Sequence, residues 1–199
     1  MMAVRNVIVA QYPKVVAASD KSPESVRKIA VVMGDPGRFD VVKPGGSFDD
    51  DDYHTITTLK NALNKLKQYK FQYFDQHDSF LQLASRWARD FDLVFNLCDE
   101  GYYNKAEYEL HVPALLEIYD VPYTGGNPQC LAYCYDKSLV RGIAKELDIP
   151  VAEAYVVKPE DTTFIDISIP FPVIIKPNFG DSSFGISQNS VCNNVKELA

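Results

Sequence analysis

Apolar residues fall into short unbroken runs and helix-like spacings from about residue 28 onward. The run at 29–33 stops at a Gly-Asp-Pro-Gly turn and predicts a strand that is buried on both faces. The same patterns predict further strands at 71–74, 92–96 and 121–124, with helices at 53–69, 80–87 and 105–119. Strands that alternate with helices indicate an α/β fold with a parallel sheet of βαβ units.

The pattern changes after Gly125 and Gly126. Asn127 is a good N-cap for a helix that starts at Pro128, and helical segments continue to about Leu147. Apolar residues at 139, 143 and 147 share one face, which we expect to be buried. Strands are predicted at 152–157, 172–176 and 186–187, and a last helix starts near 193. We therefore expect a leader (1–27), an α/β domain (28–125) and a second unit (126–199).

Composition narrows the classes of function. The chain has 199 residues, 46% of them hydrophobic, with 20 Lys and Arg against 27 Asp and Glu, a net charge of −7. Such a chain can fold, and it lacks the basic surface that nucleic acids or anionic membranes require. It contains no run of 18 apolar residues and no secretory signal, so we expect a cytoplasmic protein. Binding of a phosphate remains open, because a few cations and backbone N–H groups suffice.

The cysteines and the aspartate run contain residue types that can bind metals, but each group has a structural explanation that needs no metal. The four cysteines, Cys98, Cys130, Cys134 and Cys192, include no CxxC pair and form no disulfide framework, so we expect buried free thiols. The acidic run 49–52 fits either a helix N-cap or a cation site. Consecutive aspartates point outward in different directions, which favours the cap.

The segment 171–186 carries the clearest chemistry. Its apolar strand ends at Lys176, and a loop with Gly180, Ser182, Ser183 and Gly185 follows. Such a loop can offer backbone N–H groups and hydroxyls to a polyphosphate, while the lysine supplies a point charge. Neither a Walker A motif nor a GxGxxG fingerprint is present. The alternative is an ordinary hairpin with a surface lysine.

A second cation, Lys137, begins the amphipathic helix that ends before Pro150. A helical lysine is usually a solvated surface residue. Lys137 precedes the strand and loop of 171–186, which contain Lys176. The two lysines together indicate a ligand-binding site more strongly than either does alone.

These segments together resemble the D-alanine–D-alanine ligase-like branch of the ATP-grasp superfamily. The matching stretches keep their order and spacing over about residues 90–199: 92–97, 112–117, 121–125, 135–138, 147–150 and 174–186. The resemblance implies a Rossmann-like pre-ATP-grasp domain with a parallel sheet, followed by part of an ATP-grasp α+β subdomain.

The resemblance also implies roles for particular residues. Such enzymes are ATP-dependent ligases that join a carboxylate to an amine through an acyl phosphate. Lys137 and Lys176 would contact the nucleotide, and Ser182, Ser183 and Gly185 would lie in the flap over its phosphates. The candidates for binding a small amino-acid or carboxylate substrate are Asp99, Glu100 and Glu109. The resemblance further implies Mg²⁺ and a homodimer.

The sequence departs from the family pattern in three places. The turn 34–37 replaces the family's Gly-Gly-x-Ser-Ala-Glu motif, and Asp181 stands at a glycine position of the flap. The Mg²⁺ ligands are expected downstream of residue 199, so we assign no metal ligand and expect the 199-residue chain to be inactive. One alternative is a non-catalytic nucleotide-binding or interaction module. A receiver-type domain at 28–125, with Asp35 as its acidic residue, is weaker because Asp92 begins its strand instead of ending it.

Overall fold

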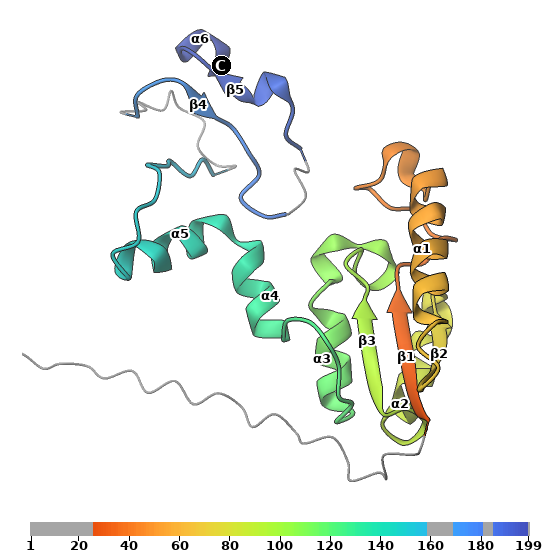
Figure 1. Cartoon of the computed structure of the whole chain (residues 1–199). Helices are drawn as coiled ribbons and strands as arrows, with labels where there is room; N and C mark the ends of the chain where they lie inside the picture. Colours follow the sequence, from red (N-terminus) through yellow and green to blue (C-terminus); the bar gives the residue numbers. More distant parts are fainter. Residues whose placement is uncertain (1–25, 159–168, 181–184, 199) are drawn as a thin grey trace, which may run out of the picture.

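The computed structural model describes residues 26–158, 169–180 and 185–198. Its main feature is a parallel sheet of three strands in the order β2-β1-β3 (Figure 1). The strands are β1 (Arg27–Met33), β2 (Tyr69–Phe74) and β3 (Leu93–Leu97). In the register, Ile29 of β1 lies opposite Phe71 of β2 and Leu93 of β3. The predicted α/β architecture with a parallel sheet is confirmed.

Helices cover both faces of this sheet. Alternate residues of β1 point to opposite sides, so Ala30 and Val32 face one layer while Val31 faces the other. The first layer contains α2 (Phe80–Asp90) and α3 (His111–Ile118), with Trp87 and Leu116 almost fully buried. The second contains α1 (Asp50–Leu63), which packs through Leu63. Burial on both faces explains why the strand at 29–33 was recognisable as a continuous apolar run.

The acidic run forms the N-terminus of α1. The Asp49 carboxylate accepts hydrogen bonds from the backbone N–H groups of Asp51 and Asp52, and the Asp52 carboxylate accepts one from the N–H of Asp49. This capping box satisfies backbone donors that the helix leaves unpaired. The N-cap prediction is confirmed. The helix starts at Asp50 and ends at Leu63, so the predicted span of 53–69 was displaced at both ends.

The predicted fourth strand, at 121–124, was wrong. In place of a strand at 121–124, Tyr123 makes a single parallel bridge to Val94. Val94 donates to the Pro122 carbonyl and Thr124 donates to the Val94 carbonyl. Proline at 122 has no N–H to give, which limits the ladder at this edge to a short contact. Pro113 lies in the first turn of α3, where a proline is tolerated.

Two helices follow the Gly125-Gly126 turn. The Asn127 side chain caps α4 (Pro128–Tyr135), and the Asp136 side chain caps α5 (Lys137–Glu146). Both helices and the Asn127 cap were predicted. The predicted burial was wrong, because Leu139, Ile143 and Leu147 are 41%, 45% and 64% exposed. Among the described residues, this apolar face is therefore only partly covered. The domain boundary itself remains a prediction.

The last part of the chain has little regular structure. β4 (Val173–Ile174) pairs antiparallel with β5 (Val191–Cys192), and α6 (Val195–Leu198) follows. The predicted strands at 152–157 and 186–187 were wrong. The first segment has no regular structure, and the second precedes a 3₁₀ turn, so the strand that pairs with β4 lies five residues later. The predicted strand at 172–176 shrinks to two residues. The Asn194 side chain accepts from the N–H groups of Lys196 and Glu197, as expected for a cap of α6.

Short 3₁₀ helices complete the described chain: η1 (Pro44–Gly46), η2 (His77–Ser79), η3 (Tyr102–Asn104), η4 (Ala106–Tyr108) and η5 (Gln188–Ser190). Among the helices of the described ranges, none has the length and apolar character to cross a membrane. The predicted leader covers residues 1–27, and apart from Val26 and Arg27 it lies outside the described residues.

The cysteine prediction was half right. All four thiols are free, and Cys98 and Cys192 are buried. Cys130 and Cys134 are exposed on α4. Their four-residue spacing places them on one helix face, and that face is turned away from the core.

Candidate functional site

A large cavity lies at the carboxyl edge of the sheet, where ligands of parallel α/β proteins usually bind. Its volume is about 870 Å³. It is lined by the ends of β1 and β3, the start of α1, the 42–44 loop and the turn before α4. Asp99, Glu100 and Glu109, the three predicted substrate residues, all line it. The structure therefore brings together three acids that the sequence placed in two separate segments.

Glu100 is the most constrained of these acids. Its side chain is 15% exposed, and its Oε2 atom is buried without a hydrogen-bond partner. The carboxyl group lies directly against Gly34 at the end of β1, because a Cβ atom there would be 2.5 Å from Oε2. Burial and the neighbouring Asp99 raise the pKa of Glu100 to about 7. This carboxyl is therefore ready to exchange a proton near neutral pH.

Lys43 is the cation that faces Glu100. Its Nζ is 3.4 Å from Glu100 Oε1 and 2.8 Å from Asp52 Oδ1. The same ammonium lies 4.3 Å from the centre of the Phe48 ring. Its two acidic partners raise the pKa of Lys43, against the opposing effect of burial. Sequence reasoning missed Lys43, since a lysine in an irregular loop carries no local signal.

The other two acids differ in their surroundings. Asp99 is exposed beside Glu100, whereas Glu109 is half-buried ahead of α3. Gly101, just after Glu100, has φ of +80° and lies against the Lys105 carbonyl, 2.1 Å from where a Cβ would be. Only glycine fits this turn, which directs the chain from β3 back across the cavity towards Glu109.

The second group of predicted site residues lies at the start of α5, where Lys137 is the first residue. Its Nζ donates a hydrogen bond to the Gly180 carbonyl, and its backbone N–H donates to the Asn178 carbonyl at 3.1 Å. Asn178 in turn bonds the cap of α5: its amide nitrogen donates to Asp136 Oδ1 at 2.8 Å and its Oδ1 accepts from the Ser138 N–H at 2.9 Å. The helix start and the segment after Lys176 are thus joined by several hydrogen bonds.

The second lysine and the loop ends lie beside this junction. Lys176 is exposed and two residues from Asn178. Gly185 has φ of +70° and approaches Pro177 so closely that a Cβ would be 2.9 Å from the proline ring. Ser182, Ser183 and Asp181 lie outside the described residues. The roles of Lys137, Lys176 and Gly185 in binding ATP stay predictions.

The described residues fit a metal less well. They contain no group of three or more His, Cys, Asp or Glu side chains arranged to hold an ion. The placement of Mg²⁺ ligands downstream of residue 199 stays a prediction.

Asp35 has a structural role in place of the predicted acidic pocket. Its carboxylate accepts hydrogen bonds from the N–H groups of His77 and Gly37, both at 2.9 Å, and lies 3.4 Å from the Arg38 guanidinium. Its backbone is tied to the Asn104 side chain by bonds of 2.9 and 2.8 Å. These partners occupy both carboxylate oxygens, which leaves little for a ligand.

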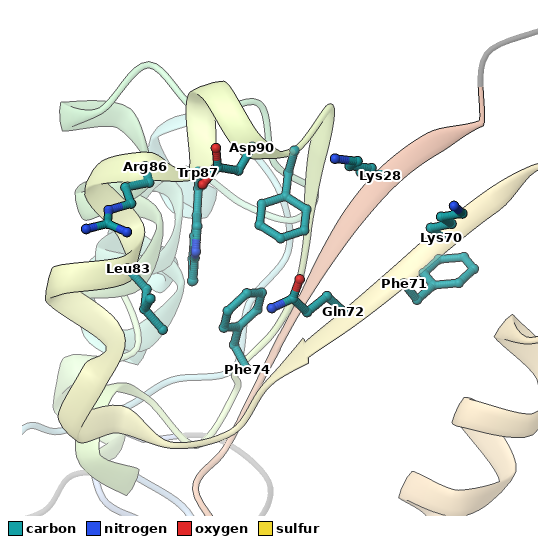
Figure 2. A pocket seen from close by; sticks show the side chains of 10 residues that line it. Lys28, Lys70, Phe71, Gln72, Phe74, Leu83, Arg86, Trp87 and Asp90 are labelled. Atoms are coloured by element: carbon teal, nitrogen blue, oxygen red, sulfur yellow. The ribbon is translucent and has the colours of Figure 1, made fainter.

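A smaller cavity of about 470 Å³ lies at the opposite end of the sheet (Figure 2). Lys28 and Lys70 come from the starts of β1 and β2, while Leu83, Trp87 and Asp90 come from α2. None of the residues predicted for the site lines this cavity. The carboxyl-edge cavity and the Lys137 junction are the candidate site.

Comparison with known proteins agrees with this fold. No protein-family model matches the chain. An uncharacterized protein of Sinorhizobium fredii is 35% identical over 100 residues, which are 50% of this chain and 28% of that protein. The D-alanine–D-alanine ligase of Solibacter usitatus is 33% identical over 79 residues, 39% of this chain and 24% of the ligase.

A solved structure extends the similarity. The D-alanine–D-alanine ligase of Bacillus anthracis, complexed with ATP, superposes with a TM-score of 0.60 and 21% identity over 86% of this chain and 52% of the ligase. The chain spans about a quarter of the length of the curated relatives and about half of the solved one. It is an α/β protein with a three-stranded parallel sheet. It is a partial homologue of the D-alanine–D-alanine ligases of the ATP-grasp family.

Proposed function

We propose that this chain provides the first domain and part of the nucleotide-binding subdomain of an ATP-dependent ligase that joins a carboxylate to an amine. The observation that carries the proposal is the junction of Lys137 with the 178–180 backbone. It unites the two sequence segments in which the resemblance places the nucleotide lysines. ATP, when bound, supplies the phosphoryl group that activates the carboxylate.

The phosphates would be held by side-chain cations. The N–H groups of Ser138 and Leu139 at the start of α5 already donate to the Asp136 carboxylate, at 3.0 Å each. That carboxylate occupies the donors which a bare helix N-terminus would offer an anion. Lys137 Nζ, now on the Gly180 carbonyl, and the exposed Lys176 ammonium would therefore neutralise the phosphate charge. Gly185, together with Ser182 and Ser183, would close over them.

The acidic cavity would receive the amine-bearing substrate. Glu100, Asp99 and Glu109 line it, and a substrate ammonium could pair with the Glu100 carboxylate. The ammonium of Lys43 already lies between Glu100 and Asp52, above the Phe48 ring. This arrangement supports the proposal, because it is the environment in which a cationic amine is stabilised. The Glu100 carboxylate would take the place of the glutamate in the family's Gly-Gly-x-Ser-Ala-Glu motif, which the 34–37 turn lacks.

Titration of the chain with ATP by calorimetry tests the nucleotide site. We expect Lys137→Ala and Lys176→Ala each to weaken ATP binding by roughly tenfold, the loss of about 1.4 kcal/mol that one charge-assisted contact supplies. Lys145→Ala is the matched control, since Lys145 is exposed on the last turn of the same helix. Wild-type affinity in both site variants would remove these lysines as ATP ligands.

A further inference from the structure

Two of the four cysteines occupy a position that the ligase chemistry does not use. Cys130 and Cys134 are exposed, whereas Cys98 and Cys192 are buried. Both exposed cysteines belong to α4, four residues apart, so their side chains are neighbours on one helix face. The neighbouring Cys130 thiol is the largest cause of a raised pKa at Cys134.

The helix geometry argues against a disulfide between these thiols. Residues i and i+4 of a helix have Cβ atoms about 5–6 Å apart. A disulfide needs Cβ atoms about 3.5–4.5 Å apart, so forming one would distort α4. A metal ion relaxes this requirement, because two metal–sulfur bonds of about 2.3 Å can bridge sulfurs up to about 4.6 Å apart. The spacing therefore suits two ligands of one ion better than a covalent link.

The charge around the pair also favours a cation. Glu109 is close enough to Cys134 for its negative charge to contribute to the raised pKa of that thiol. A cation that displaces the thiol protons would meet the negative charge of Glu109. Thiolates are soft ligands, which select cations such as Zn²⁺, Cd²⁺ or Cu⁺ over Mg²⁺.

We propose that Cys130 and Cys134 form a two-thiolate site on α4 for one thiophilic metal cation. Binding of a divalent ion releases the two thiol protons and forms two metal–sulfur bonds, with no change of oxidation state. The described residues supply no third His, Cys, Asp or Glu ligand, so water completes the coordination. The site is therefore weaker than a four-ligand structural zinc site.

The position of α4 connects such a metal site to the candidate active site. Leu131, one residue after Cys130, lines the carboxyl-edge cavity, and the last turn of α4 leads into Asp136 and Lys137. An ion bound by both Cys130 and Cys134 would make α4, which joins the cavity to the start of α5, more rigid. The metal site itself does not depend on the proposed ligase function.

Titration of the reduced chain with Cd²⁺ tests this proposal, with the ultraviolet thiolate-to-cadmium absorption as the signal. We expect one ion per chain, and roughly 100-fold weaker binding in Cys130→Ser and in Cys134→Ser, because each loses the intramolecular second ligand. Cys192→Ser is the matched control and should bind as the wild type does, and Mg²⁺ should not compete.

Thermal unfolding provides a second measurement that is independent of the absorption signal. Cd²⁺ should raise the unfolding midpoint of the wild type and of Cys192→Ser, and leave that of Cys134→Ser unchanged. Equal Cd²⁺ affinity in the wild type and both α4 variants would overturn the proposal. So would rapid air oxidation of the metal-free chain to a disulfide between Cys130 and Cys134.

Discussion

At the scale of single residues, Glu100 shows how tertiary contacts create chemistry that its neighbours in sequence do not reveal. The polar stretch after the third strand made it a candidate. Its burial, its contact with Gly34 and its pairing with Lys43 come from three separate segments. The caps Asp49 and Asn127 were predictable, because capping depends on residues within one helical turn.

Glu100 should make stability depend on pH. Its folded pKa of about 7 lies above the ordinary value of 4.5, so the folded state binds the proton more tightly. This stabilisation is complete below about pH 4.5 and is lost as the pH rises through about 7. Each unit of pKa shift corresponds to about 1.4 kcal/mol, so the loss amounts to a few kcal/mol.

Urea unfolding at pH 5 and pH 8 measures this effect. The wild type should lose more stability between these values than Glu100→Gln, which keeps the shape of the side chain without its charge. The same loss in both proteins would show that Glu100 does not titrate in this range.

Gly34 should tolerate no side chain while Glu100 is present. An alanine Cβ would lie 2.5 Å from the Glu100 carboxyl carbon, so we expect Gly34→Ala to destabilise the fold by about 1–3 kcal/mol. In a Glu100→Ala background the space is free, and the cost of Gly34→Ala should nearly vanish. A double-mutant cycle from denaturant unfolding measures the difference. Additive effects of the two substitutions would mean that the contact is unimportant.

At the scale of elements, prediction succeeded where the sequence pattern of a single segment was enough to define its structure. β1 is an apolar run because it is the central strand, covered by helices on both sides. The segments 121–124, 152–157 and 186–187 are equally strand-like in composition. A strand, however, requires a hydrogen-bonding neighbour, and the position of a neighbour is not encoded in the segment itself. Hence Tyr123 makes one bridge, and β4 pairs with residues 191–192.

The start of α5 should depend on Asp136. Its carboxylate accepts from the N–H groups of Ser138 and Leu139 and from the amide of Asn178. These hydrogen bonds keep the pKa of Asp136 below its ordinary value. Asp136→Ala should destabilise the chain, because it removes the side-chain acceptor that caps α5. Asp136→Asn, which retains an acceptor oxygen, should lose clearly less in denaturant unfolding. Identical losses in the two variants would contradict the capping role.

At the scale of the whole molecule, the sheet domain is well covered and the C-terminal part is not. Leu116 of α3 is fully buried, while Ile143 of α5 is 45% exposed. The predicted apolar face of α5 exists, but the pattern alone could not say whether a partner covers it. Amphipathic spacing records which side of a helix is apolar and nothing about what it meets.

Substitutions in these two helices should therefore behave differently. Ile143→Lys should change the unfolding free energy by no more than about 0.5 kcal/mol and reduce self-association of the chain. Leu116→Ala should cost about 2–5 kcal/mol, because it opens a cavity in the core. Denaturant unfolding and sedimentation check both expectations. A large loss of stability in Ile143→Lys would mean that the α5 face is covered.

The hydrogen bonds that join Asn178 to the start of α5 also set a kinetic expectation. They connect residues 40 and 42 positions apart, in contrast to the local turns that build each helix. Closing a loop of that length costs an entropy equivalent to about 3 kcal/mol. Few contacts in the described part of the C-terminal region repay it. The sheet and the helices packed on it should consequently form first, and the junction between α5 and the segment after Lys176 should be among the last contacts made and the first lost.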